Sequence, residues 1–250
     1  MGHVLTLALD TSSPTGSIAV LRESECQGIV STRGDEAYSS RLFRQLQFLL
    51  DELSLKLEEF DLFAVCTGPG SFTGLRVGLA AVKGWAEVYQ KPVAAVNGLG
   101  AVAAQSRCGA NLVVPVLDAR RSQVYFSKYR RQDDTIPASW TAEAEECVMT
   151  PQEFIQELAL WQRQSRFGTR EMAIVTPDAA LGGVMEEFRA SNAWARNIQA
   201  EQVSSVLAPY IGQLGVLHAK QGRLTDALSL DANYVRRSDA ELKWKDPAAL

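Results

Sequence analysis

The stretch TGPGSFTGLRVGLA, residues 67–80, places four glycines between an apolar run and a helical pattern. The run DLFAVCT (61–67) is typical of a buried strand, and LRVGLAAVKGWAEVYQ (75–90) predicts a helix. A strand, a glycine-rich loop and a helix in this order point backbone N–H groups and the positive end of the helix dipole at one place, where an anion can bind. The stretch therefore predicts either a phosphate loop or a tight turn that packs a helix on a sheet.

The spacing of these glycines excludes two common phosphate motifs. No Lys-Ser or Lys-Thr pair follows Gly74, as a Walker A loop requires, and Gly68, Gly70 and Gly74 have one residue too many between them for the dinucleotide fingerprint. Asp10 ends the first predicted strand before a Ser/Thr-rich turn and is similar to the acid that meets magnesium phosphate in actin-like ATPases. An aspartate in this position is also an ordinary start of a turn, so phosphate contact stays open.

Apolar runs and turn residues predict alternating strands and helices along the chain. In the first half we expect an antiparallel hairpin of 4–10 and 16–22, a third strand at 26–33, a helix over 37–57, a strand at 92–96 and a short helix capped by Asn97. In the second half we expect strands at 112–120, 122–131 and 173–177, an irregular acidic stretch at 133–146, a helix opened by the Thr150–Glu153 capping box, and a helix over 204–223 interrupted near Pro209. This order suggests a degenerate internal duplication.

Two predicted helices carry unusual surfaces. In helix 37–57 one stripe is apolar and predicts the core side, whereas Phe48 and Leu55 fall on the opposite side. In helix 75–90 only a narrow stripe is charged, and Gly78, Ala81 and Gly84 would let another helix approach closely. These patterns indicate either a central helix between a sheet and its neighbour or a contact with a second protein. The predicted core stripe of the first helix consists of Leu42, Phe43, Leu46, Leu49, Leu50, Leu53 and Leu57.

Composition restricts the functional classes. The chain has 250 residues, of which 46% are hydrophobic and 22% charged, so it can bury a globular core. Its net charge of -4 disfavours unaided binding of nucleic acid. No apolar run is long enough for a membrane span, and the N-terminal apolar run lacks a preceding basic region, so we expect a cytoplasmic protein.

Histidines and cysteines are few and scattered. The chain has two histidines, His3 and His218, and four cysteines without CxxC spacing. Zinc motifs, histidine-based metal sites and Ser/His/Asp triads all need histidines or cysteines in a defined arrangement. The sequence therefore predicts no metal site and no disulfide framework.

Four segments together resemble the TsaB (YeaZ) family, the bacterial accessory proteins of tRNA threonylcarbamoyladenosine biosynthesis. They are LALDTSSPTGSIAVL, TGPGSFTGLRVGLAAVKGWA, VLDARRSQVYFSKY and the tail NYVRR. The resemblance covers residues 4–130, is faint over 135–200 and returns at Tyr234 and Arg236. It implies an α/β actin-like ATPase (ASKHA, RNase H-like) fold of two lobes with the second reduced. The implied lobes are 1–108, completed by the helix near 204–223, and 109–203, followed by an extended tail at 224–250.

The resemblance also implies a function and partners. Such a chain is a noncatalytic scaffold or activator that pairs with the catalytic paralog TsaD and works with the ATPase TsaE. The complex transfers a threonylcarbamoyl group to N6 of the adenosine 3' of the anticodon in tRNAs that read ANN codons. We therefore expect no catalytic residue, no resident cofactor and contact with tRNA through the complex. Weak ATP or ADP binding at the heterodimer surface and homodimerisation through the same helices stay open.

The resemblance assigns two sets of residues. The partner docks through the first two helices, which here gives Phe48, Leu55, Leu75, Val77, Gly78, Ala81, Val82 and Trp85 as interface residues. The vestigial phosphate-loop or structural motif consists of Asp10, Thr11, Gly68, Pro69, Gly70, Ser71, Thr73, Gly74, Asp118 and Arg120, with Ser71 or Thr73 as the helix cap.

Two departures and two alternatives remain. Tyr38 and Ser39 stand where the family commonly has His and Ser or Thr, and Ala232 stands where it has Pro. The main alternative is a stand-alone actin-fold ATPase or kinase that uses Asp10, the glycine loop and Asp118. Against it, the second lobe offers no glycine cluster at the corresponding hairpin. A glycopeptidase is disfavoured because the chain lacks a paired metal-ligand histidine motif and a Ser/His/Asp set.

Overall fold

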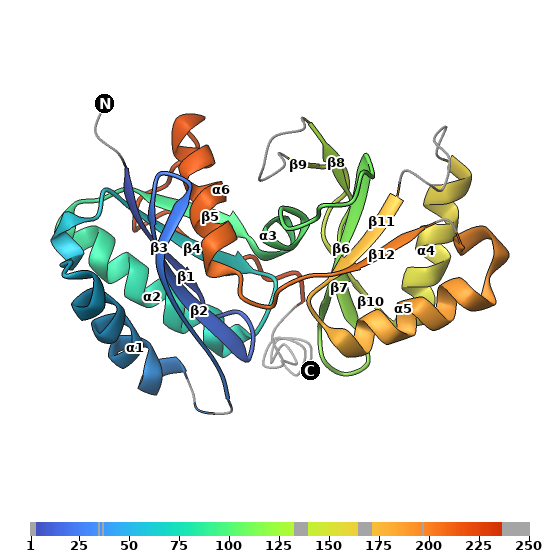
Figure 1. Cartoon of the computed structure of the whole chain (residues 1–250), viewed down its shortest axis with the longest axis horizontal. Helices are drawn as coiled ribbons and strands as arrows, with labels where there is room; N and C mark the ends of the chain where they lie inside the picture. Colours follow the sequence, from blue (N-terminus) through green and yellow to red (C-terminus); the bar gives the residue numbers. More distant parts are fainter. Residues whose placement is uncertain are drawn as a thin grey trace, which may run out of the picture.

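The structure is a computed structural model that describes residues 4–34, 36, 38–132, 140–164, 172–196 and 198–236 (Figure 1). Two sheets with helices between and outside them make up the fold. The first sheet has the order β3-β2-β1-β4-β5, in which β1 to β3 are antiparallel and β4 and β5 run parallel to β1. Its strands are β1 (Leu5–Asp10), β2 (Thr15–Arg22), β3 (Glu25–Arg33), β4 (Leu62–Gly68) and β5 (Val93–Asn97).

The second sheet repeats the strand order of the first. Its path is β10-β7-β6-β11-β12, with β8 paired to β6 and β9 paired to β8. Both β7 and β8 pair antiparallel with β6, so together they correspond to β2, and β9 and β10 correspond to β3. The strands are β6 (Leu112–Asp118), β7 (Val124–Phe126), β8 (Tyr129–Arg131), β9 (Trp140–Ala142), β10 (Cys147–Met149), β11 (Met172–Thr176) and β12 (Gln199–Gln202).

Helices lie on both faces of the first sheet and on both faces of the second (Figure 1). α1 and α2 cover the outer face of the first sheet, α3 and α6 lie between the sheets, and α4 and α5 cover the outer face of the second. Short helical turns η1 (Leu57–Glu59) and η3 (Ala193–Ala195) follow α1 and α5. The helices are α1 (Tyr38–Leu53), α2 (Phe72–Tyr89), α3 (Gly98–Ala103), α4 (Pro151–Gln164), α5 (Ala179–Ser191) and α6 (Ala208–Lys220).

The side-chain alternation of the strands explains these layers. In β1, Leu5, Leu7 and Leu9 point to the α1–α2 side, whereas Ala8 points to the shared core beside α6. The α6 side of the sheet carries several alanines beside Leu21 and Leu62, and an added Cβ at Gly215 would lie 2.7 Å from the Ala64 Cβ. α6 can therefore pack directly on the strand backbones. The two-lobed actin-like fold expected from the sequence is confirmed, and the reduction of the second lobe consists of three-residue strands at β7 to β10.

Most predicted elements are present with shifted ends. The expected helix 37–57 ends at Leu53, where Ser54 takes a left-handed φ of 53°. The expected interruption near Pro209 is wrong, because Pro209 lies in the first turn of α6, where its missing N–H costs no hydrogen bond. The capping box is confirmed: the Thr150 backbone N–H and hydroxyl donate to Glu153 Oε2, and the Glu153 N–H donates to Thr150 Oγ1.

Three predictions on the chain pattern need correction. Strand 122–131 is broken into β7 and β8, and the stretch expected to be irregular contains β9, while its residues 133–139 lie outside the described part. α5 and β12 were not predicted at all. Phe43, expected in the core, is 57% exposed because it lies at the edge of the apolar stripe of α1. In the part of the chain that the structure describes, no helix has the length and apolar character of a membrane span.

Candidate functional site

The glycine loop packs directly against the turn between β1 and β2. A Cβ added to Gly70 would lie 2.4 Å from the Ser12 carbonyl oxygen, and one added to Gly74 would lie 2.1 Å from the Thr11 carbonyl oxygen. A Cβ at Gly78 would lie 2.3 Å from Thr11 Oγ1. Side chains do not tolerate such distances, so the start of α2 approaches the turn as closely as it does because these positions are glycines.

Hydrogen bonds join the same two segments. The Ser71 N–H donates to the Ser12 carbonyl (2.7 Å), and the Thr11 hydroxyl donates to the Gly74 carbonyl (2.8 Å). Ser71 caps α2, since its Oγ accepts the Gly74 N–H at 3.2 Å, whereas Thr73 does not act as the cap. The Gly68–Pro69 peptide is cis, and Gly68 has a φ of 115°. The loop thus serves as a packing turn, and part of the anion-binding capacity of the α2 N-terminus is used within the chain.

Asp10 is fully buried next to this turn. Its Oδ1 accepts the Ser12 N–H (2.9 Å) and the Ser12 hydroxyl (2.7 Å), and its Oδ2 has no hydrogen-bond partner among the described residues. Burial raises the pKa of Asp10, and the bonds from Ser12 oppose this only in part. The same environment raises the pKa of the buried Cys66 thiol, mainly through burial and then through the Asp10 charge. An acid held in this way is a structural part of the turn.

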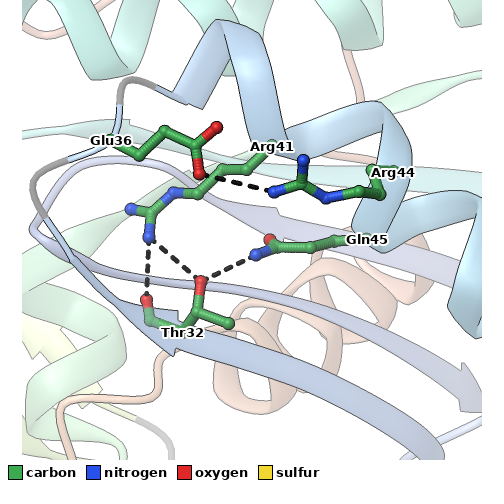
Figure 2. Close-up of polar contacts among 5 residues, drawn as sticks. All are labelled: Thr32, Glu36, Arg41, Arg44 and Gln45. Carbon is green, nitrogen blue, oxygen red and sulfur yellow. Dashed lines mark hydrogen bonds and ion pairs between the residues drawn. The ribbon is translucent and has the colours of Figure 1, made fainter.

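A polar cluster lies where α1 meets β3 and the first turn (Figure 2), with Arg41 and Gln45 buried and Thr32 exposed. Arg41 donates from Nη1 to the Thr32 Oγ1 (3.0 Å) and from Nη2 to the Pro14 carbonyl (3.2 Å). Gln45 donates to the same Thr32 oxygen at 2.7 Å, and Arg44 reaches Glu36 at 3.4 Å. Arg41 therefore fixes the start of α1 to β3 and to the turn between β1 and β2.

Tyr38 completes this cluster at the position where the family commonly has histidine. Its ring lies 4.1 Å from the Arg41 guanidinium carbon, and its hydroxyl occupies the space that a side chain at Gly16 would need. Burial raises the pKa of Tyr38 to about 12. A neutral phenol beside a guanidinium is a poor cation site, and the described residues contain no group of three or more His, Cys, Asp and Glu side chains able to hold a metal ion.

Asp118 and Arg120 lie on the hairpin turn of the second lobe. Asp118 Oδ1 accepts the Arg120 N–H at 2.7 Å, and the two side chains form an exposed ion pair at 3.8 Å. Arg120, Arg121 and Ser122 all take left-handed φ values, between 54° and 61°. Asp118 thus shapes its own turn, as Asp10 does in the first lobe.

The tail of the chain contacts both lobes, which sequence reasoning missed. Asn233 donates through its backbone to the Thr67 carbonyl (2.7 Å) and through its side chain to Glu146 (2.8 Å). Glu146 also accepts a hydrogen bond from Asn97. These residues are far apart in sequence and show no common motif; the resemblance at Tyr234 and Arg236 was the available signal.

α2 carries an apolar stripe whose members range from half-buried (Val77, Ala81) to exposed (Gly84, Val88). Val77, Ala81, Gly84 and Val88 fall within about 60° of the helix circumference at 100° per residue. Val88 is 73% exposed, and Gly84 has no atom within 4 Å of an added Cβ. Trp85 borders the stripe and meets Phe43 of α1 edge to face, with ring centroids 6.4 Å apart. We call this surface, made of Phe43, Val77, Ala81, Gly84, Trp85 and Val88, the α1–α2 seam.

The structure corrects several predicted interface residues. Leu75, Gly78 and Val82 are buried on the sheet side of α2, so their assignment to a protein–protein surface is wrong. Composition did not reveal this, because α2 is apolar on nearly all sides. Leu55 lies beyond the end of α1 and packs half-buried against the core. Phe48 is 58% exposed, but it lies about 140° around α1 from Phe43.

Two glycines of α2 provide a matched test of the packing turn. We expect Gly74→Ala to lower the free energy of unfolding by about 1–3 kcal/mol, because its Cβ would collide with the Thr11 carbonyl. We expect Gly84→Ala to raise it by about 0.5–1 kcal/mol, because the site is open and alanine favours helix. Urea unfolding of both variants measures the difference, and a stable Gly74→Ala variant would contradict the packing role.

The burial of Asp10 predicts a pH-dependent effect. Because its pKa is higher in the folded than in the unfolded chain, Asp10 should cost the wild type stability as pH rises above about 4. Asp10→Asn keeps an oxygen for Ser12 but does not ionise. We therefore expect the variant to gain stability relative to the wild type between pH 4 and pH 8, measured by urea unfolding. A difference that is the same at both pH values would rule out the raised pKa.

Comparisons with known proteins agree with this fold. A family model described as "TsaD: tRNA N6-adenosine threonylcarbamoyltransferase" matches residues 17–206. The chain is 29% identical to the "tRNA threonylcarbamoyladenosine biosynthesis protein TsaB" of Bacillus subtilis, over 95% of this chain and 96% of that protein. It is 27% identical to the protein of the same name from Haemophilus influenzae, over 98% of each. The structure "YeaZ from Pseudomonas aeruginosa" matches with a TM-score of 0.69 at 24% identity and covers 92% of this chain and 99% of that chain. The chain therefore belongs to the TsaD family of tRNA N6-adenosine threonylcarbamoyltransferases, among its TsaB (YeaZ)-type members.

Proposed function

We propose that this chain is a noncatalytic scaffold subunit in tRNA threonylcarbamoyladenosine biosynthesis, which pairs with a catalytic TsaD paralog. The names of the relatives support the pathway. The observation that carries the scaffold role is the contrast between the two candidate sites. The glycine loop and Asp10 are used inside the fold, whereas the α1–α2 seam leaves apolar side chains exposed.

The same contrast disfavours the stand-alone ATPase. An acid that binds a magnesium phosphate must be charged and must face the ligand, but Asp10 is buried with a raised pKa. The N–H groups of Ser71 and Gly74 at the start of α2 donate within the chain. Any ATP or ADP would then bind weakly, at the heterodimer surface.

The α1–α2 seam has the properties of a helix-docking surface. Its centre carries small residues, Ala81 and Gly84, which let a helix approach, and its border carries an aromatic pair, Phe43 and Trp85, that can anchor a partner. We propose that two helices of the paralog pack here, and that a second copy of this chain packs here when the paralog is absent. TsaE and tRNA would join through the heterodimer in the cytoplasm, since a net charge of -4 disfavours direct tRNA binding.

A pair of valines tests the docking surface. Val88, on the seam, and Val184, on α5 of the second lobe, are both exposed helix residues, at 73% and 43%. We expect Val88→Glu to weaken pairing with the TsaD paralog at least tenfold, because a carboxylate would be buried in an apolar interface, and Val184→Glu to leave it unchanged. Isothermal titration of each variant against the paralog measures this. Equal affinity for the two variants would exclude the seam as the interface.

Reconstitution tests the function itself. With TsaD, TsaE and the enzyme that makes threonylcarbamoyl-AMP, we expect tRNA modification to depend on this chain and Asp10→Asn to retain at least half of the wild-type activity. The chain alone should not hydrolyse ATP. If Asp10→Asn were as defective as omission of the chain, or if the isolated chain hydrolysed ATP, the ATPase alternative would replace the scaffold role.

A further inference from the structure

The C-terminal segment is first attached to the first lobe. Thr225 pairs with Val93 at the start of β5 through two backbone hydrogen bonds of 2.8 and 3.0 Å. Leu230 is buried in the core beneath α1 and α2. The Asn233 N–H then donates to the Thr67 carbonyl at the end of β4, and an added Cβ at Gly68 would lie 2.9 Å from the Asn233 carbonyl oxygen. The segment thus reaches the glycine loop in a defined position.

Tyr234 continues this attachment on α2. Its ring lies 4.9 Å from that of Phe72, and its hydroxyl accepts a hydrogen bond from Arg76 Nε at 3.2 Å. The Arg76 guanidinium also stacks on Phe72, at 3.8 Å from the ring centre. The side chains of Phe72 and Arg76 therefore hold Tyr234 at the start of α2.

The segment next contacts the second lobe. Arg236 Nη1 donates to the Ala119 carbonyl (3.0 Å) and to Gln123 Oε1 (3.3 Å), both in the β6–β7 turn. The Asn233 side chain donates to Glu146, just before β10. Residues only three apart in the tail thus bond to two different parts of the second lobe.

Glu146 joins three parts of the molecule. It accepts hydrogen bonds from Asn97, at the end of β5, and from Asn233 in the tail, and Asn97 accepts one from the Tyr129 hydroxyl of β8 at 3.2 Å. Burial raises the pKa of Glu146, and the two amide donors oppose this. Since no positive side chain pairs with it among the contacts described, the two asparagines are its main support.

Elsewhere at the junction, the lobes are joined by the chain itself and by apolar contacts. The chain crosses between the lobes at 104–111 and again at 203–207, and one core cluster joins α3, α6 and residues of both sheets. Gln105 and Ser204 tie the two crossings together with two hydrogen bonds of 3.0 Å. The tail makes a third connection, which consists of hydrogen bonds to the second lobe. Figure 1 shows its described end in red between the lobes.

We propose that residues 233–236 form a latch that fixes the second lobe to the first, with the two chain crossings acting as its hinge. The latch works through Asn233 and Arg236, while Tyr234 secures it to α2. It fixes the angle between the lobes in the isolated chain, independently of the proposed paralog.

Distance measurements between spin labels test the latch. One label goes on the exposed Cys26 of β3 and the other on Glu187→Cys of α5, in a chain with Cys108→Ser and Cys147→Ser, diluted with unlabelled protein. The test variant is Asn233→Ala with Arg236→Ala. The control is Leu228→Ala, which changes an 89% exposed residue of the same tail. We expect one narrow distance in the wild type and the control, and a broader distribution with a second population in the test variant.

Hydrogen exchange provides the second readout. In the test variant we expect the amide of residue 233 to exchange roughly tenfold faster, while the Thr225 amide stays protected by Val93. Wild-type distances in the test variant would overturn the proposal. This holds also if the Thr225 amide loses its protection, because a fully released tail would then have no effect on the lobes.

Discussion

The contact between the first turns of α2 and the β1–β2 turn is the constraint on which the rest of the first lobe depends. Carbonyl oxygens of Ser12 and Thr11 leave no room for a side chain at Gly70 and Gly74, and the Thr11 hydroxyl leaves none at Gly78. This contact sets the height and direction of α2 on the sheet. α1 then packs beside it through Phe43 and Trp85, so the position of the exposed seam follows from backbone packing in the glycine loop.

The two lobes share one topology but use it differently. In the first sheet, the leucines of β1 face α1 and α2, while Ala8, Ala64 and Ala94 face α6 and admit it closely. The second sheet directs one face of β6 to α4 and α5 and its other face to the shared core. In both lobes an aspartate at the end of the first strand shapes the following turn, through Ser12 in one case and Arg120 in the other.

Sequence reasoning succeeded where the signal is local. The Asn97 cap and the Thr150 capping box depend on neighbouring residues and were predicted correctly, and Ser71 was one of the two residues predicted to cap α2. It failed where tertiary packing decides the outcome. Examples are which side of the apolar α2 faces the sheet and whether an edge residue such as Phe43 is covered. The Glu146 network joins residues up to 136 positions apart along the chain, from Asn97 to Asn233, and such contacts leave no period in a single sequence.

The placement of α6 has a consequence for how the chain is made. This helix covers the alanine face of the first sheet, yet it follows the whole second lobe in the sequence. During synthesis from the N-terminus, all five strands of the first sheet emerge more than 100 residues before the helix that covers them. Until then that face lacks the cover of α6, which favours binding by chaperones or delayed collapse. The first sheet thus receives the cover of α6 only after the second lobe has been translated.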